Sequence, residues 1–371
     1  MAANETNTNY NNLFASFKIG NTEFQNRLGV APMTRTSANP DGTPNDDMLA
    51  YYQSFAAGGF SLIISEGTYP DEAYSQGYLD QPGIANDEQV KAWKKITDAV
   101  HKEGAKIFCQ LMHAGALSQG NRFKSEKIGP SAIQPKGEQL GFYGGNGPYP
   151  APKEMTVQDI ETVKQSFVKA AENAVNAGFD GIEIHGANGY LLDQFLTDYT
   201  NNRTDQYGGS TANRIRLSAE IVKATREAID KSIPVGIRIS QGKVNDYVHK
   251  WAGGEEDAKV IFSALKDAGA DFIHTTEFEA LKPAFDESGP TLAALAKKYS
   301  QLPIIVNGSL NTPDLAEKML ENGGADIITI GKGALANRDW PNKVLNGEEL
   351  NEFKPENFLM PDAKLKPHEV E

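Results

Sequence analysis

Residues 181–190, GIEIHGANGY, form the most informative stretch of this sequence. The first four are typical of a buried strand, which ends in two hydrogen-bonding side chains, His185 and Asn188. Small residues surround them, so the backbone can approach a ligand closely, and the phenol of Tyr190 follows. Because His185 and Asn188 are three residues apart, one helical turn would set them side by side as two donors for one acceptor atom. The alternative interpretation is a satisfied loop histidine followed by a capping asparagine.

This strand is the fourth of eight short apolar segments that alternate with amphipathic helical segments. The other strands are predicted at residues 28–33, 62–65, 106–112, 235–239, 271–275, 304–307 and 326–330. Helices are predicted at residues 46–57, 87–103, 156–177, 211–229, 255–267 and 291–299, from Pro313 onwards, and after the last strand. Repeated strand–helix units in unbroken order require parallel strands and right-handed crossovers. Eight units predict an α/β protein with a closed (β/α)8 barrel, and an open sheet of six or seven strands is the alternative.

The composition shows no break along the 371 residues, so we expect one (β/α)8 domain over residues 1–371. Within it we predict a polar tail at residues 1–12 and an N-terminal extension before the barrel. Residues 114–154, after the third strand, are rich in Gly and Pro without a helical period, which predicts a functional insertion or lid. Residues 349–371 are charged and lack sustained periodicity, so we expect a C-terminal tail.

Charge and cysteine content exclude several classes of protein. A net charge of −13 disfavours a nucleic-acid or anionic-membrane partner. The single cysteine, Cys109, rules out an internal disulfide or a cysteine-rich metal site, and we expect no metal. No apolar run approaches the ~18 residues of a membrane span. The N-terminal residues lack the features of a secretory signal, which predicts a cytoplasmic protein.

In such a barrel the active site lies at the carboxyl ends of the strands. Arg238 lies within the apolar run VGIRI and Gln110 within IFCQLMH, so both polar groups require partners. A salt bridge to a neighbouring carboxylate would satisfy Arg238. The functional alternative is that Arg238 and Gln110 face the barrel mouth and hold the pyrimidine edge of a heterocycle.

Small residues end the last two strands, at the place where barrels commonly bind phosphate. The seventh strand ends in Asn307, Gly308 and Ser309, and the eighth in Gly331 and Lys332. We predict a phosphate site there, and the alternative is a pair of ordinary left-handed turns with a surface lysine.

From about residue 13 to 344, the sequence closely resembles the Old Yellow Enzyme family of NADH:flavin oxidoreductases, which are FMN-dependent ene-reductases. The stretches that carry the resemblance are NRLGVAPMTR (26–35), YYQSFAAGGFSLIISEGT (51–68), QLMHAG (110–115), AGFDGIEIHGANGYLLDQFL (177–196), NNRTDQYGGS (201–210), NRIRL (213–217) and GADIITIGKGALANRDWP (324–341). Their shared order and spacing make the resemblance specific.

The resemblance implies non-covalently bound FMN. The implied cofactor-binding residues are Pro32, Met33, Thr34, Gly67, Gln110, Arg238, Asn307, Gly308, Ser309, Gly331 and Lys332. Thr34 would hydrogen-bond the flavin near its C4 oxygen, Gly67 and Gln110 would contact its pyrimidine edge, and Arg238 would lie at the N1/O2 locus. At Lys332 the family usually has arginine, so phosphate binding would depend more on backbone N–H groups. Where Ser309 stands, many relatives have glycine.

The implied reaction reduces the C=C bond of an α,β-unsaturated aldehyde, ketone or nitroalkene. NADPH or NADH would reduce FMN and leave, which predicts ping-pong kinetics. His185 and Asn188 would bind the substrate oxygen, hydride would pass from flavin N5 to the β-carbon, and Tyr190 would protonate the α-carbon. We expect a monomer or homodimer. The alternatives are a non-flavin barrel lyase or isomerase that binds phosphate, and a flavin-binding sensor or scaffold.

Overall fold

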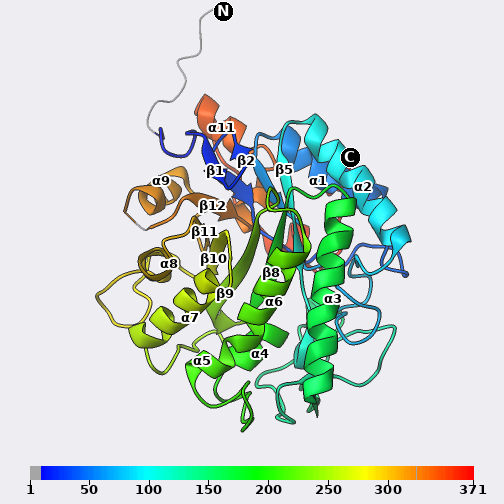
Figure 1. Ribbon diagram of the computed structural model, residues 1–371. Helices are drawn as coiled ribbons and strands as arrows, with labels where there is room; N and C mark the ends of the chain where they lie inside the picture. Colours follow the sequence, from blue (N-terminus) through cyan, green and yellow to red (C-terminus); the bar gives the residue numbers. More distant parts are fainter. Residues whose placement is uncertain (1–9, 323) are drawn as a thin grey trace, which may run out of the picture.

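Eight parallel strands close into a barrel in the computed structural model, which describes residues 10–322 and 324–371 (Figure 1). Around the ring they are β3 (Leu28–Val30), β4 (Leu62–Ile64), β5 (Lys106–Leu111), β8 (Gly181–Asn188), β9 (Val235–Lys243), β10 (Phe272–Thr276), β11 (Ile304–Asn307) and β12 (Ile327–Ile330). The last strand, β12, pairs with β3 and completes the ring. The predicted (β/α)8 barrel is therefore confirmed, and the open sheet is wrong.

Helices surround the ring and follow the strands in sequence (Figure 1). The principal ones are α1 (Asp46–Ala57), α2 (Asp87–Lys102), α3 (Val157–Asn176), α6 (Arg216–Ala228), α7 (Glu255–Asp267), α8 (Leu292–Ser300), α9 (Pro313–Asn322) and α11 (Trp340–Asn346). Side chains stabilise several helix starts, because Asn45, Asn86 and Thr156 each accept a hydrogen bond from a first-turn backbone N–H. The helix predicted at 211–229 is divided into α5 (Thr211–Arg214) and α6.

An apolar layer fills the amino-terminal end of the barrel. A hairpin of β1 (Phe17–Ile19) and β2 (Thr22–Phe24) covers this end, and its Ile19 and Phe24 pack against side chains inside the ring. The N-terminal extension thus closes the base of the barrel. Residues 1–9 of the predicted polar tail lie outside the described residues.

Two glycines make room for the rings of this layer. A Cβ atom on Gly181 would lie 2.5 Å from the Phe108 ring, and one on Gly236 would lie 2.5 Å from the Phe272 ring. The two rings have centroids 5.6 Å apart. Because Gly181 is the first residue of β8 and Gly236 the second residue of β9, aromatic side chains from β5 and β10 have room to fill the base of the barrel.

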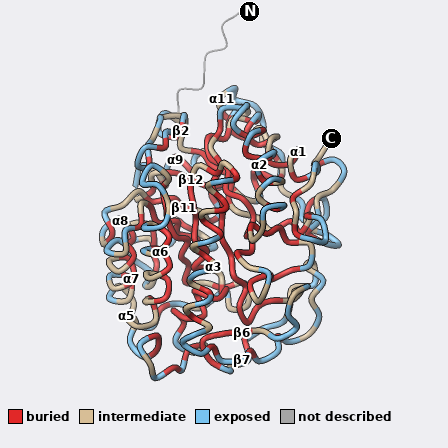
Figure 2. The backbone as a smooth tube through the Cα atoms, turned by 45° about the vertical axis from the view of Figure 1, so that its right-hand side comes forward, coloured by how far each residue is buried: buried red, intermediate tan, exposed pale blue. Residues whose placement is uncertain are grey.

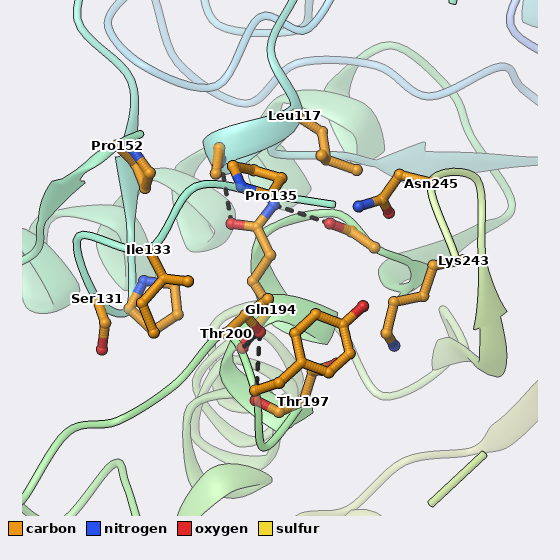
Figure 3. A pocket seen from close by; sticks show the side chains of 14 residues that line it. Leu117, Ser131, Ile133, Pro135, Pro152, Gln194, Thr197, Thr200, Lys243 and Asn245 are labelled. Carbon is orange, nitrogen blue, oxygen red and sulfur yellow. Dashed lines mark hydrogen bonds between the residues drawn. The ribbon is translucent and has the colours of Figure 1, made fainter. Parts of the chain in front are cut away.

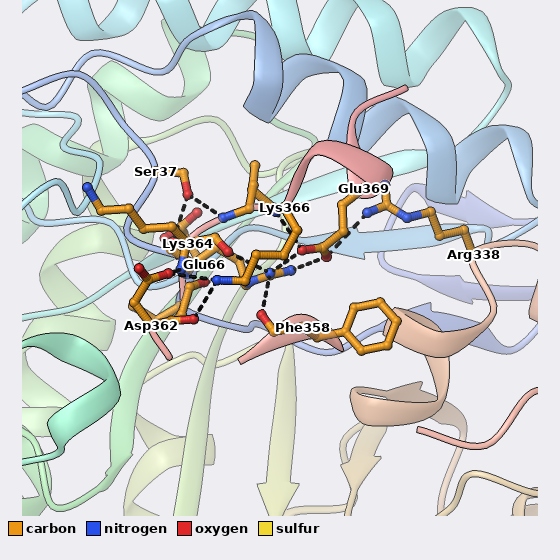
Figure 4. A network of polar contacts seen from close by, with 12 residues as sticks. Ser37, Glu66, Arg338, Phe358, Asp362, Lys364, Lys366 and Glu369 are labelled. Carbon is orange, nitrogen blue, oxygen red and sulfur yellow. Dashed lines mark hydrogen bonds and ion pairs between the residues drawn. The ribbon is translucent and has the colours of Figure 1, made fainter. Parts of the chain in front are cut away.

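The C-terminal segment packs on the barrel close to the end of β3. Both Arg35 side-chain nitrogens Nη1 and Nη2 donate to the Glu369 carboxylate at 2.6 Å, and both side chains are fully buried (Figure 4). Arg35 Nε also donates to the Ala363 carbonyl. This segment includes α12 (Pro355–Phe358) and a 3₁₀ turn, η3 (Pro367–Glu369). The charged residues predicted as a tail therefore form part of the packed structure.

The insertion at residues 114–154 contains little regular structure. It holds the 3₁₀ turns η1 (Gly115–Leu117) and η2 (Gly141–Tyr143) and strand β6 (Ile128–Gly129), which pairs with β7 (Lys153–Glu154). Buried backbone is concentrated in the barrel strands and exposed backbone in the outer loops (Figure 2). In residues 10–322 and 324–371, no helix has the length and apolar character needed to cross a bilayer.

Candidate active site

An open pocket of about 380 Å³ lies at the carboxyl ends of the barrel strands. Every site residue predicted from the sequence lines it except Gly67: Pro32, Met33, Thr34, Gln110, His185, Asn188, Tyr190, Arg238, Asn307, Gly308, Ser309, Gly331 and Lys332. Gly67 is packed beneath Met112, whose sulfur would lie 2.3 Å from an added Cβ, and its carbonyl accepts a hydrogen bond from Gln81. Its predicted contact with a ligand stays a prediction.

His185 and Asn188 both belong to β8, so the helical turn predicted between them is wrong. The pairing of β8 with β9 is irregular between Gly186 and Asn188, and Asn188 has φ = +62°. Asparagine tolerates this left-handed conformation better than most residues. The irregularity brings both side chains to the same pocket.

The His185 imidazole is buried, and its Nδ1 atom has no hydrogen-bond partner within the described part of the chain. Burial lowers the pKa of His185 well below its usual value, and the Arg238 guanidinium and the His274 imidazole add to this effect. At neutral pH His185 is therefore a neutral imidazole, with one N–H to donate and one nitrogen that accepts.

The Tyr190 phenol lies beside His185, with ring centroids 5.1 Å apart, and its hydroxyl is 2.7 Å from that of Tyr78. Burial raises the pKa of Tyr190 to about 12, although the hydrogen bond with Tyr78 opposes the rise. Tyr190 is therefore protonated at neutral pH. Tyr78 was not predicted, because it lies in an irregular segment after β4 where the sequence carries no periodic signal.

Arg238 donates from Nη2 to Thr276 Oγ1 at 3.2 Å and to Asn307 Oδ1 at 3.1 Å, both neutral groups. Its Nε atom is buried and has no hydrogen-bond partner within residues 10–322 and 324–371. Burial lowers the pKa of Arg238 to about 10, and nearby Glu183 partly offsets this effect. The guanidinium is still charged at neutral pH, so it can donate to an acceptor in the pocket.

Gln110 donates from Nε2 to Glu183 Oε1 at 2.8 Å. Because Gln110 Nε2 is hydrogen-bonded to Glu183 beneath the pocket, the amide oxygen is the atom that can accept a hydrogen bond from a ligand in the pocket. Gln110 and Arg238 thus offer an acceptor and a donor to the same ligand.

The far end of the pocket has the backbone conformations of an anion site. Gly308 has φ = +150° and Ser309 has φ = +52°, and a Cβ atom on Gly308 would lie 2.4 Å from the Glu277 carbonyl oxygen. The Ser309 hydroxyl donates to the Phe278 carbonyl at 2.6 Å, so this proton is not available to a ligand. Lys332 is exposed at the start of α10 (Lys332–Ala336) and supplies a cation.

The structure adds lining residues that the sequence did not reveal. Leu140, Phe142 and Tyr143 come from the 114–154 insertion, and Leu359 comes from the C-terminal segment. The Tyr143 hydroxyl donates to the Thr34 carbonyl at 3.0 Å, which fixes the insertion to the end of β3. These residues lie far from β3 in sequence, and no local pattern predicts such contacts.

A second cavity, behind Gly189, has room for about one water molecule (Figure 3). Its polar wall includes Lys243, which pairs with the buried Asp193 at 2.9 Å. The cavity is too small for an organic substrate, whereas the wide pocket is lined by the predicted site residues and is therefore the candidate active site. Among the described residues, no group of three or more His, Cys, Asp or Glu side chains could hold a metal ion.

Comparisons with known proteins match nearly the whole chain. The sequence model described as "NADH:flavin oxidoreductase / NADH oxidase family" matches residues 12–351. The chain is 35% identical to NADH oxidase of Thermoanaerobacter brockii over 94% of its own length and 52% of that protein. It is 34% identical to a probable flavin mononucleotide-dependent alkene reductase of Leishmania infantum, over 92% of each chain. The structure of the old yellow enzyme homologue from Zymomonas mobilis superimposes with a TM-score of 0.85 at 32% identity, covering 96% of this chain and 98% of the other.

Proposed function

The chain belongs to the NADH:flavin oxidoreductase / NADH oxidase family, the Old Yellow Enzymes, and we propose that it reduces the C=C bond of α,β-unsaturated aldehydes, ketones or nitroalkenes. The protein is an NAD(P)H-dependent flavin oxidoreductase.

The side chains of the pocket fit FMN. Arg238 has a buried, unpartnered Nε within the described residues, and Gln110 has a free amide oxygen, so together they match a ring edge that carries both acceptors and an N–H. Gly308, Ser309, Gly331 and Lys332 provide backbone N–H groups and a cation for a phosphate. Pro32, Met33 and Thr34 line the pocket at the end of β3. When bound, FMN supplies the two-electron chemistry, accepting a hydride from NADPH or NADH and passing it to the β-carbon of the alkene.

His185 and Asn188 would donate hydrogen bonds to the carbonyl or nitro oxygen of the substrate. Their hydrogen bonds strengthen as negative charge develops on that oxygen, and such a donor is worth about 3 kcal/mol in a preorganised site. The neutral state of His185 suits this role, because a buried imidazolium would require a counter-charge.

Tyr190 would deliver the proton to the α-carbon. The pKa of about 12 keeps the proton on its oxygen until the substrate becomes basic. Tyr78 is placed to donate to the Tyr190 oxygen at 2.7 Å, which would direct the Tyr190 proton towards the pocket and stabilise the phenolate that its loss creates.

The main support for this proposal is that two sets of functional side chains line the same pocket. The oxygen-binding and proton-donating residues, His185, Asn188 and Tyr190, share it with the ring-binding pair Gln110 and Arg238. A substrate placed against the ring would therefore meet both the donors and the acid.

The visible spectrum of the purified protein, followed by anaerobic reduction and reoxidation, tests the proposal. We expect flavin absorbance, bleaching by NADPH or NADH, and recovery on addition of 2-cyclohexenone. Parallel titrations with the two nucleotides identify the reductant. A colourless protein would favour a phosphate-binding lyase or isomerase. Retained flavin without oxidation of either nucleotide against any activated alkene would favour a sensor or scaffold.

A further inference from the structure

A layer of hydrogen-bonded polar side chains crosses the barrel interior directly below the pocket. Glu183 lies opposite Gln110 on the neighbouring strand β5, and His274 lies opposite Arg238 on β9. Glu183 Oε2 is 2.7 Å from His274 Nδ1, and His274 Nε2 is 3.0 Å from Thr329 Oγ1. Barrel interiors are normally filled by branched apolar side chains, so a fully buried carboxylate here requires an explanation.

Glu183 is ionised at neutral pH. Burial by itself would raise its pKa, but the hydrogen bond from His274 Nδ1, the charge of the Arg238 guanidinium and the hydrogen bond from Gln110 oppose burial, and the pKa of Glu183 is lowered. Burial also lowers the pKa of His274, which is therefore neutral and donates its Nδ1 proton to the carboxylate. The net result is one negative charge beneath the positive charge of Arg238.

An ionised carboxylate only accepts hydrogen bonds. Gln110 must therefore turn its NH₂ group towards Glu183 and its oxygen towards the pocket. The opposite amide orientation would bring two oxygens together in a dry environment, because the Phe108 and Phe272 rings fill the barrel below. The buried charge thus decides which atom of Gln110 a ligand meets.

We propose that Glu183 is a positioning residue for the cofactor: it fixes Gln110 as a hydrogen-bond acceptor, and its charge balances Arg238 at the pyrimidine edge of the flavin. This inference rests on the proposed function. An acceptor beside a cationic donor selects a heterocycle in which an imide N–H adjoins a carbonyl, as the N3–H and O2 of a flavin do. The negative charge also disfavours added electron density on the ring, so Glu183 lowers the reduction potential of the bound flavin.

Glu183→Gln tests this inference, because it keeps the size of the side chain but removes its charge. The amide can also donate a hydrogen bond, so it no longer fixes the orientation of Gln110. In titrations of apoprotein with FMN we expect the Kd of oxidised FMN to rise about tenfold, with little change for reduced FMN. By linkage this corresponds to a reduction potential about 30 mV more positive. In NMR spectra of bound ¹⁵N-labelled FMN, we expect the N3 proton to exchange faster with water than in the wild type.

Glu317→Gln is the matched control. Glu317 is also a buried glutamate, and it accepts hydrogen bonds from Asn12 Nδ2 at 2.8 Å and the Leu13 amide at 3.0 Å, away from the pocket. We expect this substitution to leave FMN affinity, potential and N3 exchange unchanged.

The possible outcomes separate this inference from the proposed function. Wild-type protein without FMN affinity would refute the proposed function. Wild-type protein with FMN, together with a Glu183→Gln variant of unchanged affinity, potential and N3 exchange, would overturn the role of Glu183 alone. Should Glu183→Gln fail to fold, Glu183→Asp takes its place. It keeps the charge but retracts it, so we expect faster N3 exchange and weaker FMN binding at an unchanged potential, and unchanged exchange and affinity would overturn the inference.

Discussion

Individual buried ionisable residues hold the loops around the pocket, and Glu66 is a clear example. Its carboxylate accepts from the backbone N–H groups of Arg35 at 2.9 Å and Thr36 at 3.2 Å, and Tyr52 donates to it at 3.4 Å. Thr36 has φ = +43°, an unusual conformation for threonine. Glu66 therefore fixes the chain just beyond Thr34, the residue expected to contact the flavin.

Glu66 should make the stability of the protein depend on pH. Burial raises the pKa of Glu66 to about 7, from an ordinary value of 4.5. Folding thus favours the protonated form, so the stabilising contribution is complete below the unfolded pKa and is lost as the pH rises through 7. Between pH 5 and pH 8 the wild type should lose about 2 kcal/mol relative to Glu66→Gln. Urea unfolding at the two pH values measures this, and a difference independent of pH would contradict it.

Tyr190→Phe should separate the two halves of the reaction. The variant keeps the ring but loses the proton, so reoxidation by 2-cyclohexenone should slow by about 100-fold or more, while reduction by NAD(P)H is unchanged. Stopped-flow absorbance measures both rates. Tyr78→Phe is the informative comparison, since it keeps the acid and removes only its partner at 2.7 Å, and should have the smaller effect. Unaltered reoxidation in Tyr190→Phe would remove its role as the acid.

At the scale of helices and strands, much of the structure could be predicted from the sequence. α1, α7 and β11 have the predicted bounds, because each has a local period and clear end signals. The site residues were predicted from their places at the carboxyl ends of strands, from polar side chains within apolar runs and from the family resemblance, and all of them except Gly67 line one pocket. The same argument that identified Arg238 as a charge in an apolar run applies equally to Glu183, which was not singled out.

The features of the fold and pocket that the sequence did not predict depend on contacts between distant segments, which leave no local pattern in the sequence. The extension of β9 beyond Ile239 and the irregularity at Asn188 arise from pairing between two strands. The lining residues from the 114–154 insertion and the C-terminal segment are held by hydrogen bonds such as Ala363 N–H to the Phe142 carbonyl at 2.9 Å, across more than half of the chain. A single sequence read for periodicity cannot reveal these pairings.

Gly236 provides a test of packing at the base of β9. Gly236→Ala would place a Cβ atom 2.5 Å from the Phe272 ring, so we expect a loss of about 1–3 kcal/mol through overpacking. Gly141→Ala is the control, because an added Cβ there meets nothing within 4 Å. The free energies of unfolding in urea compare the two. Equal stability of both variants would show that the aromatic layer can shift to accept the methyl group.

On the scale of the whole molecule, the C-terminal segment joins parts of the pocket that no single element connects. Glu369 binds Arg35 after β3 (Figure 4). Lys364 pairs with Asp80 at 2.9 Å in the segment after β4. Leu359 lines the pocket itself. The segment is therefore a strap across the side of the active site.

Glu369→Gln should weaken this strap. Removing one partner of a fully buried ion pair leaves the Arg35 charge uncompensated, which costs about 3 kcal/mol of unfolding free energy. We also expect faster release of FMN, because Arg35 adjoins Thr34. Thermal unfolding and flavin fluorescence in a dilution experiment measure the two effects. Glu352→Gln, at an exposed position of the same segment, should match the wild type in both, and equal behaviour of the two variants would contradict the expectation.

The contact between Arg35 and the C-terminal segment also imposes a delay on folding during biosynthesis. Arg35 and Glu369 are 334 positions apart, and ribosomes add roughly 5–20 residues per second, so tens of seconds separate the synthesis of the two partners. The seven barrel strands after β3 are all synthesised within that interval, while the Arg35 guanidinium still lacks its carboxylate partner. We therefore expect the loop that carries Thr34 to reach its final form, and to bind the cofactor, only after the C-terminal segment has been synthesised.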